Sequence, residues 1–278
     1  MGNLFAYNKL RTIKLPPTLE IMDSGCFQGN VLTQIEFPKT LHEISSSVFK
    51  DNQFENIIIP DQITKIGAYA FQNNKLNSVI LSSNLTKIEI GAFENNKLQE
   101  ITFPVGIIEI GKEAFQSNQI KQLVLPNSVT SIGERAFRYN PLEQATLSEN
   151  LTVIPNELFR YSKLTTIDLP EKITTIGDYA FEQNKLTNIQ FPNSLISIGK
   201  EAFENNDLES VTIPAHVEEI KTKAFSKCGW SNVGECNKRL KKIINQTGKE
   251  FDWNDIIKGT VGTPAITGTF NGVNVVTE

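Results

Sequence analysis

Side chains of the kinds most often used in catalysis are few and widely separated in this 278-residue chain. There are two histidines, His42 and His216, and three cysteines, Cys26, Cys228 and Cys236. A catalytic dyad or a metal site needs such side chains to converge in a cleft. The sequence has no glycine-rich phosphate loop and no G-x-S-x-G motif. We therefore predict that the chain is not an enzyme and has no catalytic residue, cofactor site or metal site.

Two of the cysteines flank an irregular segment, CGWSNVGEC. Cys228 and Cys236 could close a short disulfide loop in an extracellular setting, and two free thiols are the alternative. Cys26 directly precedes Phe27, at a position where other parts of the chain have alanine. We expect Cys26 to be a buried free thiol.

Phenylalanine recurs every 22 residues, and this period defines the elements that position all other side chains. The recurring residues are Phe5, Phe27, Phe49, Phe71, Phe93, Phe115, Phe137, Phe159, Phe181, Phe203 and Phe225. A fixed period of about 20–50 residues predicts a solenoid, in which each coil buries its apolar face against the next. By this spacing, His42 and His216 lie about eight coils apart, roughly 38 Å along the axis. They cannot share one site.

Other positions recur in phase with the phenylalanine. Apolar residues alternate over a short segment that proline usually ends, as at Ile167, Leu169 and Pro170, which is typical of a strand. A second apolar pair follows, and a glycine such as Gly177 then permits a tight bend. Asparagine stands three residues after most of the phenylalanines, and we interpret these side chains as a ladder bonded to backbone groups at the turn. The members are Asn8, Asn30, Asn52, Asn74, Asn96, Asn118, Asn140, Asn184 and Asn206.

The unit L-x-x-I-x-L-P-x-x-[LIV]-x-x-I-G-x-x-A-F-x-x-N-x resembles the BspA-type leucine-rich repeat family, over about residues 4–245. The resemblance implies a right-handed, β-rich α/β solenoid with a parallel sheet on one face and short helical turns. It also implies a cell-surface or secreted bacterial protein that binds other proteins, often in adhesion. The period predicts about ten to eleven coils. We expect a solenoid over residues 1–245 and a cap helix with a β-hairpin tail over 246–278.

The composition adds few constraints on partners. The net charge is −4 and the basic residues are scattered, so no nucleic-acid partner is expected. No apolar segment approaches the roughly 18 residues of a membrane span, and we expect no membrane insertion. Because residue 1 enters the repeat part-way and no signal or anchor is recognised, we expect a fragment of a longer extracellular or surface protein.

The outward row of the predicted strands is the first candidate binding site. Four adjacent coils place Ile58, Ile80, Thr102 and Val124 there. Branched apolar residues on a solvated sheet face indicate a contact patch. The alternative is simple strand propensity.

The second candidate site lies where the repeat degenerates, between Phe137 and Ser162. Arg138 and Tyr139 precede Arg160 and Tyr161 by one period. Arginine and tyrosine are enriched at interface hot spots. A degenerate coil with cation–π surface pairs is the alternative.

The last departure is at the C-terminal end, where the strand pattern resumes ten residues late, at Leu240, Ile243 and Ile244. Aromatic residues of the segment FDWNDIIKG could then cover the last coil as a short helix. Residues 265–277 are predicted to form a hairpin, with its turn at Asn271-Gly272.

Together these features favour a noncatalytic recognition or adhesion module that binds a protein partner, such as a host extracellular protein. Two alternatives stay open: a rigid spacer of a larger surface protein whose activity lies elsewhere, and a glycan-binding module.

Overall fold

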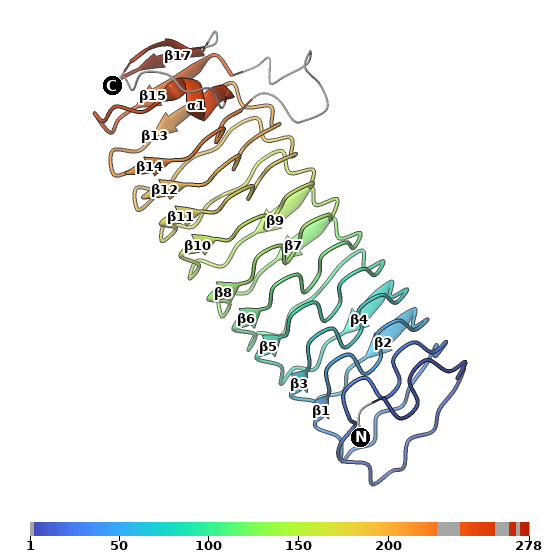
Figure 1. Ribbon diagram of the computed structural model, residues 1–278. Helices are drawn as coiled ribbons and strands as arrows, with labels where there is room; N and C mark the ends of the chain where they lie inside the picture. Colours follow the sequence, from blue (N-terminus) through green and yellow to red (C-terminus); the bar gives the residue numbers. More distant parts are fainter. Residues whose placement is uncertain (1–2, 227–239, 259–266, 271–272, 278) are drawn as a thin grey trace. The chain divides into compact units, whose positions relative to one another are not determined.

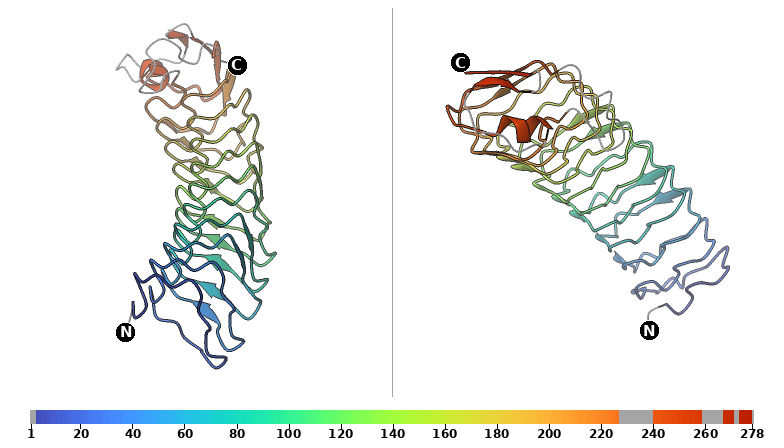
Figure 2. Two further views of the ribbon diagram at one scale, coloured as in Figure 1. Left: turned by 90° about the vertical axis from the view of Figure 1, so that its right-hand side faces the viewer. Right: turned by 45° about the horizontal axis from the view of Figure 1, so that its top comes forward.

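The computed structural model describes residues 3–226, 240–258, 267–270 and 273–277. The chain divides into two compact units, Met1–Pro141 and Leu142–Glu278. Each unit is a stack of coils with a 22-residue period, built from short parallel strands and turns (Figures 1 and 2). The described residues contain one helix, the six-residue α1. The predicted parallel-strand solenoid and its period are confirmed, whereas the coil number and the right-handed path stay predictions.

The first unit has strands in two rows. The predicted strand segment forms β2 (Asn56–Ile58), β4 (Ser78–Ile80) and β7 (Gln122–Val124), and β2 pairs with β4 in parallel. A five-stranded parallel sheet that was not predicted forms at the second member of each second apolar pair, for example at Ile132 of the pair Val129 and Ile132. Its strands are β1 (Glu43–Ile44), β3 (Lys65–Ile66), β5 (Lys87–Ile88), β6 (Glu109–Ile110) and β8 (Ser131–Ile132).

The second unit repeats this arrangement. Its second apolar pairs form a parallel sheet of β10 (Val153–Ile154), β11 (Thr175–Ile176), β12 (Ser197–Ile198) and β14 (Glu219–Ile220). The other row contains β9 (Gln144–Thr146), β13 (Ser210–Ile213) and β15 (Lys242–Asn245). Val211 pairs with Ile243, one period plus ten residues later. This register confirms the predicted ten-residue insertion.

Phenylalanine rings form the centre of each unit. In the first unit, consecutive rings from Phe27 to Phe137 stack at centroid distances such as 5.6 Å for Phe71 and Phe93. In the second unit, Phe181 and Phe203 stack at 5.3 Å. The rings from Phe49 onward are almost completely buried. One period therefore places one ring per coil, which explains why the sequence repeats phenylalanine so strictly.

The expected short helical turns around each phenylalanine are not confirmed, because hydrogen-bonded turns occupy these segments. The backbone N–H of Phe71 donates to the carbonyl oxygen of Ala92 in the next coil, at 2.9 Å. An α-helix would need the carbonyl four residues earlier as the acceptor. Flanking residues such as Tyr69 and Asn73 have left-handed backbone angles, with φ of 59° and 57°. The coil-to-coil bonds thus replace helical ones.

The asparagine ladder is confirmed for eight of its nine predicted members; Asn8 is exposed and donates only to the nearby carbonyl oxygen of Ala6, at 3.1 Å. The side-chain amide of Asn74 donates to the carbonyl oxygens of Phe49 (2.9 Å) and Phe71 (3.1 Å). Its oxygen accepts from the backbone N–H of Phe54 at 3.2 Å. Equivalent bonds are made by Asn30, Asn52, Asn96, Asn118, Asn140, Asn184 and Asn206.

The repeated glycine allows close packing of coils. A Cβ atom on Gly133 would lie 2.2 Å from the backbone nitrogen of Lys112, and one on Gly199 would lie 2.4 Å from the carbonyl carbon of Gly177. None of these three glycines has a positive φ. Glycine is therefore needed at these positions because the backbones of neighbouring coils lie too close for a side chain, rather than because the chain makes the tight bend that was expected.

The C-terminal elements lie against the last coil of the second unit. Helix α1 (Trp253–Lys258) buries Trp253, Ile256 and Ile257, and the N–H of Phe225 donates to the carbonyl of Ile256 at 3.2 Å. Strand β16 (Gly268–Phe270) pairs antiparallel with β17 (Val273–Val276), and β17 pairs in parallel with β15. The predicted turn at 271–272 lies outside the described residues. The two strands extend the solenoid's own sheet.

Candidate functional site

Three branched apolar side chains form an exposed row on the first unit. Ile58, Ile80 and Val124 are 63%, 60% and 64% exposed, and the exposed Thr102 lies in the coil between the last two. Ile58 and Ile80 are direct neighbours on the paired strands β2 and β4. We call these four residues the apolar row. Apolar side chains that are this exposed have an unfavourable contact with water. A partner that covers them would remove this contact and gain binding free energy.

The backbone beneath the apolar row is held rigidly. Ile57 and Leu123, which alternate with the exposed residues, are buried. Ser78 donates its hydroxyl to the Asn56 side chain of the preceding coil at 2.7 Å. A partner would therefore meet a surface that is already ordered, which lowers the entropic cost of binding.

A groove of about 420 Å³ continues the apolar row between two coils. Its lining includes Ile80, Leu81, Glu100, Thr102 and Phe103. The segment around Thr102 forms no strand with β4. The groove lies where this pairing is interrupted.

The presence of a strand is related to the type of residue at the end of the strand segment, the repeat position of Leu81 and Phe103. Every strand in this row that the repeat predicts ends at or just before an aliphatic residue: Ile59, Leu81, Leu125, Leu147 or Ile213. No strand forms where it is phenylalanine: Phe37, Phe103 and Phe191. Phe103 packs edge-on against Phe115 at 5.5 Å and Phe137 at 6.4 Å, so the core of this coil holds an additional ring where the strand is missing. Leu15 and Leu169 also lie in segments without a strand.

The first of the two arginine–tyrosine pairs lies in the first unit. The guanidinium of Arg138 lies 4.5 Å from the ring centroid of Tyr139 and donates to its hydroxyl at 3.1 Å. Tyr139 is 44% exposed. The pair thus forms the cation–π contact considered from the sequence and still presents its ring to solvent.

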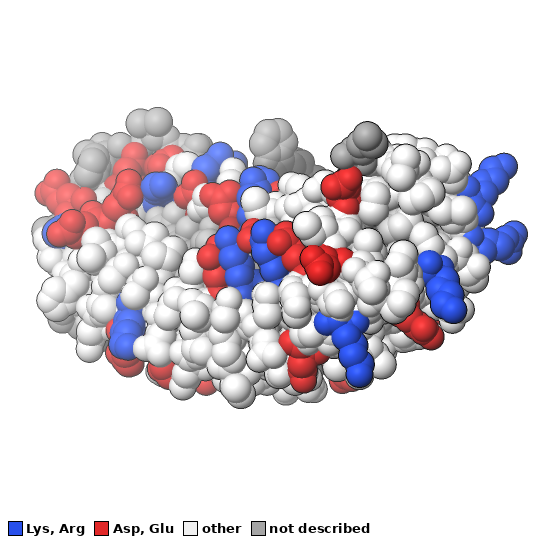
Figure 3. Space-filling view, turned by 90° about the horizontal axis from the view of Figure 1, so that it is seen from below, with Lys and Arg blue, Asp and Glu red and all other residues white. Residues whose placement is uncertain are grey.

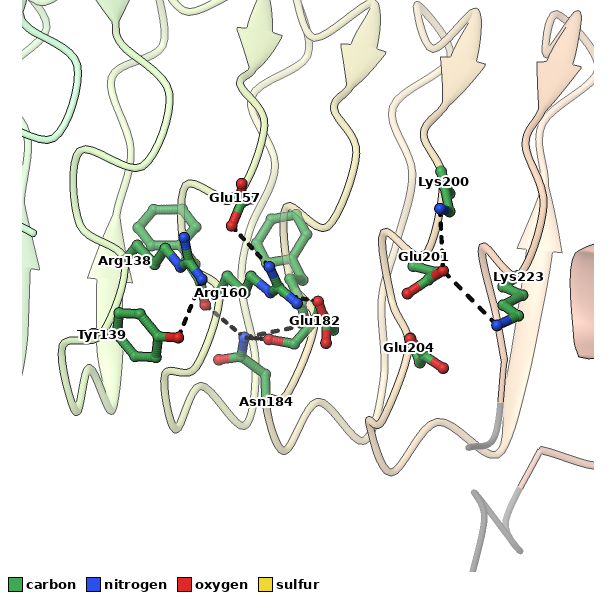
Figure 4. A network of polar contacts seen from close by, with 12 residues as sticks. Arg138, Tyr139, Glu157, Arg160, Glu182, Asn184, Lys200, Glu201, Glu204 and Lys223 are labelled. Atoms are coloured by element: carbon green, nitrogen blue, oxygen red, sulfur yellow. Dashed lines mark hydrogen bonds and ion pairs between the residues drawn. The ribbon is translucent and has the colours of Figure 1, made fainter. Parts of the chain in front are cut away.

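The second pair, in the second unit, has a different environment. Arg160 forms ion pairs with Glu157 (2.9 Å) and Glu182 (2.5 Å), as Figure 4 shows, and its guanidinium lies near the rings of Tyr161 and Tyr179. The Arg160 side chain is 20% exposed and that of Glu182 is 5% exposed. Burial raises the pKa of Glu182, and the nearby guanidinium opposes that rise. The guanidinium of Arg160 is therefore already paired with two carboxylates. The neighbouring Tyr161 is 38% exposed.

A buried carboxylate pair beside this network was missed by sequence analysis. Glu204 is fully buried and Glu201 nearly so. Lys200 and Lys223 lie 3.6 and 3.9 Å from Glu201 (Figure 4). Burial, followed by the hydrogen bond and charge of Glu201, raises the pKa of Glu204 to about 8. Glu204 directly follows Phe203, and other coils have glutamine, lysine or arginine at this position. Polar residues of these kinds gave no reason to predict that Glu204 is buried.

Some of the charged side chains elsewhere form pairs of opposite charge. Lys65 contacts Glu43 at 2.8 Å, and Lys87 contacts Glu109 at 3.2 Å, across neighbouring strands. On the face drawn in Figure 3, acidic and basic side chains lie beside one another. Exposed pairs of this kind contribute roughly 0–1 kcal/mol each, so they do not account for the fold's stability.

The remaining predicted residues have simple environments or none described. Cys26 is a buried free thiol, as expected, and burial raises its pKa to about 11. Cys228 and Cys236 lie outside the described residues. His42 bonds the carbonyl of Gln62 through Nδ1 at 3.0 Å.

Within the described part of the chain, no group of three histidine, cysteine, aspartate or glutamate residues could hold a metal ion. No helix in that part is both long and apolar enough to cross a bilayer.

Comparison with solved structures shows the same fold in one bacterial protein and a lower structural similarity to others. A leucine-rich repeat protein from Bacteroides ovatus is 22% identical, with a TM-score of 0.55 over 95% of this chain and 70% of its own. The Treponema protein described as T. pallidum leucine-rich repeat protein is 27% identical (TM-score 0.45, 55% and 75% covered). A leucine-rich cell surface protein from Faecalibacterium prausnitzii is 16% identical (TM-score 0.35, 85% and 83% covered).

No curated protein matches the chain. The model of the family described as the BspA type leucine-rich repeat region matches residues 2–121 and 108–231, in six copies. The match covers most of the chain and agrees with the 22-residue period, the phenylalanine stack and the asparagine ladder. The chain therefore belongs to the BspA-type leucine-rich repeat family.

Proposed function

We propose that this chain is a noncatalytic recognition module, of the adhesion type, that binds a protein partner at the cell surface or as a secreted protein. The apolar row carries the proposal, because Ile58, Ile80 and Val124 are each 60% or more exposed on one ordered face. Family membership supports the location and the class of partner. A host extracellular protein is the partner that this proposal favours.

The geometry of the apolar row supports a protein partner rather than a glycan. Branched aliphatic side chains gain stability when apolar groups cover them, at about 25 cal/mol per Å². They offer no hydrogen bonds to a hydroxyl-rich ligand. The neighbouring groove could accept one protruding partner side chain. Tyr139 in the first unit and Tyr161 in the second are proposed as additional, independent contact residues, with Arg138 and Arg160 orienting their rings.

The experiment is a binding screen of the full chain against extracellular matrix proteins, serum proteins and common glycans. We expect a saturable protein partner whose affinity falls at least tenfold in Ile80→Lys. Ile108→Lys is the matched control, because Ile108 is 49% exposed in the same unit beside strand β6. Circular dichroism would verify that both variants fold.

Four outcomes would contradict parts of the proposal. Equal affinity of Ile80→Lys and the wild-type chain would remove the apolar row as the site. A partner that is lost in Tyr139→Ala or Tyr161→Ala instead would move the site to those tyrosines. No saturable partner at tens of micromolar would favour the rigid-spacer function, and a glycan partner would favour the glycan-binding alternative.

A further inference from the structure

A second groove lies on the second unit, four repeats after the groove beside the apolar row. Its volume is about 370 Å³. Asp168 occupies the position of Ile80, Gln190 that of Thr102, and Phe191 that of Phe103. Neither of its two flanking segments, around Asp168 and around Gln190, forms a strand, whereas β4 lies on one side of the first groove. Each unit therefore has a groove beside a strand segment that ends in phenylalanine.

The chemistry of the second groove is different, because its rim consists of polar side chains. Asp168, Glu171, Asn188 and Gln190 line it and are all exposed. Two carboxylates and two amides supply several hydrogen-bond acceptors around one small volume. A ligand held here would therefore be rich in donors.

The two carboxylates are not neutralised by the protein. Among the described residues, no cation forms an ion pair with Asp168 or Glu171 and no side chain donates to them. Lys172, the nearest cation in the sequence, instead donates to Asn150 at 2.6 Å. No lysine or arginine lines the groove. Charge complementarity thus favours a cationic ligand over a neutral one.

The ring of Phe191 favours a guanidinium over an ammonium group as the cation in this groove. Phe191 lines the groove and remains partly exposed, although it also packs against Phe203 at 5.6 Å. A guanidinium is planar, stacks on aromatic rings and donates in pairs to carboxylates, whereas an ammonium is a compact, strongly hydrated charge. Asp168, Glu171 and Phe191 together match the guanidinium better.

We propose that this groove binds an arginine side chain presented by an extended segment of a protein partner. The inference goes beyond the proposed function, because that function rests on the apolar row of the other unit. The two sites can therefore succeed or fail separately. A neutral sugar is disfavoured because it would leave two carboxylates without a counter-charge.

The test uses the full chain and three fluorescein-labelled peptides of alternating threonine and a second residue: arginine, lysine or citrulline. Citrulline keeps the shape of arginine without its charge. Fluorescence anisotropy at physiological salt measures each affinity. We expect saturable binding of the arginine peptide, at least fivefold tighter than the lysine peptide, and no measurable binding of the citrulline peptide.

Two double variants then locate the site. Asp168→Asn/Glu171→Gln should weaken arginine-peptide binding at least fivefold. Glu218→Gln/Glu219→Gln is the control, because it removes the same charge from exposed positions at strand β14. Equal weakening by the control would mean non-specific attraction and overturn the proposal. Equal binding of the citrulline peptide, or competition by a neutral oligosaccharide such as maltopentaose, would overturn it too.

The apolar-row variant Ile80→Lys separates this proposal from the proposed function. We expect it to bind the arginine peptide as the wild-type chain does. If no peptide binds to the folded wild-type chain, the arginine groove is refuted, whatever the protein-binding screen finds.

Discussion

The side-chain amide of Asn96 donates to the carbonyl oxygen of Phe71, 25 residues earlier, at 2.9 Å. The same side chain accepts from the backbone N–H of Leu76 at 3.0 Å. All three residues are buried. One asparagine thus satisfies backbone groups that neither strand nor turn pairing reaches, and it does so across neighbouring coils.

Asn96→Leu should therefore destabilise the chain strongly. The substitution leaves the buried N–H of Leu76 without an acceptor, at a cost of about 1–3 kcal/mol. It also removes one of the two amide donors of the Phe71 carbonyl oxygen, which Asn74 still bonds at 3.1 Å. We expect the free energy of unfolding to fall by about 1–3 kcal/mol, measured by urea denaturation. Glu100→Gln, at an exposed position of the next strand segment, should change it by less than about 0.5 kcal/mol. Equal effects of both changes would refute the ladder's role.

Ser162 offers the reverse experiment. It occupies the asparagine position of its coil, and its buried hydroxyl has no hydrogen-bond partner among the described residues. Ser162→Asn should raise the free energy of unfolding by about 1 kcal/mol, because the amide can reach backbone groups that the shorter hydroxyl cannot. A lower melting temperature in this variant would show that the degenerate coil does not tolerate the consensus residue.

Gly133→Ala should destabilise the first unit. The added methyl group would lie 2.2 Å from the backbone nitrogen of Lys112, a contact that requires neighbouring coils to separate. We expect a loss of about 1–3 kcal/mol, as for overpacked cores. Gly106→Ala is the matched control, because a Cβ there meets no atom within 4 Å. Thermal denaturation of the two variants compares the positions directly, and a stable Gly133→Ala would contradict close coil packing.

Ser117 allows a test of backbone strain, since its φ is 57°. A left-handed conformation costs a non-glycine residue roughly 1 kcal/mol. Ser117→Gly should therefore stabilise the chain by up to about 1 kcal/mol, whereas Ser117→Val, with a branched Cβ, should destabilise it. Chemical denaturation would measure both. The same sign of change in both variants would rule out strain as the cause.

Glu204 should make stability depend on pH. Its pKa is raised to about 8 in the folded chain, mainly by burial, while an unfolded glutamate titrates near 4.5. Between these values the unfolded chain releases a proton that the folded chain keeps. Stability should therefore fall as pH rises from about 5 to 8, by up to about 1 kcal/mol per pH unit.

Glu204→Gln should flatten this pH dependence in urea titrations at pH 5, 6, 7 and 8. Glutamine is compatible with the position, because Gln116 follows Phe115 in the same way and donates to Glu94 at 3.0 Å. Glu219→Gln, at an exposed position, should leave the slope unchanged. An undiminished slope in Glu204→Gln would assign the pH dependence to other groups.

The repeat pattern predicted which strand residues are exposed, but it did not predict which side chains contact one another at the turns. Alternation along the strand correctly placed Ile58, Ile80, Thr102 and Val124 on the exposed side, because successive residues of a strand face opposite ways. The same reasoning could not foresee that Arg160 would contact Glu157 and Glu182. Side chains at turn positions meet neighbours in adjacent coils, and the choice among those neighbours depends on rotamers.

The sequence by itself determined the repeating coil, because one ring, one asparagine and one strand segment must recur in phase for identical coils to stack. It also determined that Cys26 is buried, since its position in the repeat faces the core. Only the tertiary structure decided how much space lies between coils. Phe103 and Phe191 share a position with leucine and isoleucine, and their effect on strand pairing depends on how whole rings pack. The burial of Glu204 was likewise decided by packing, because solvent exposure at a turn depends on side chains from neighbouring coils that lie far away in the sequence.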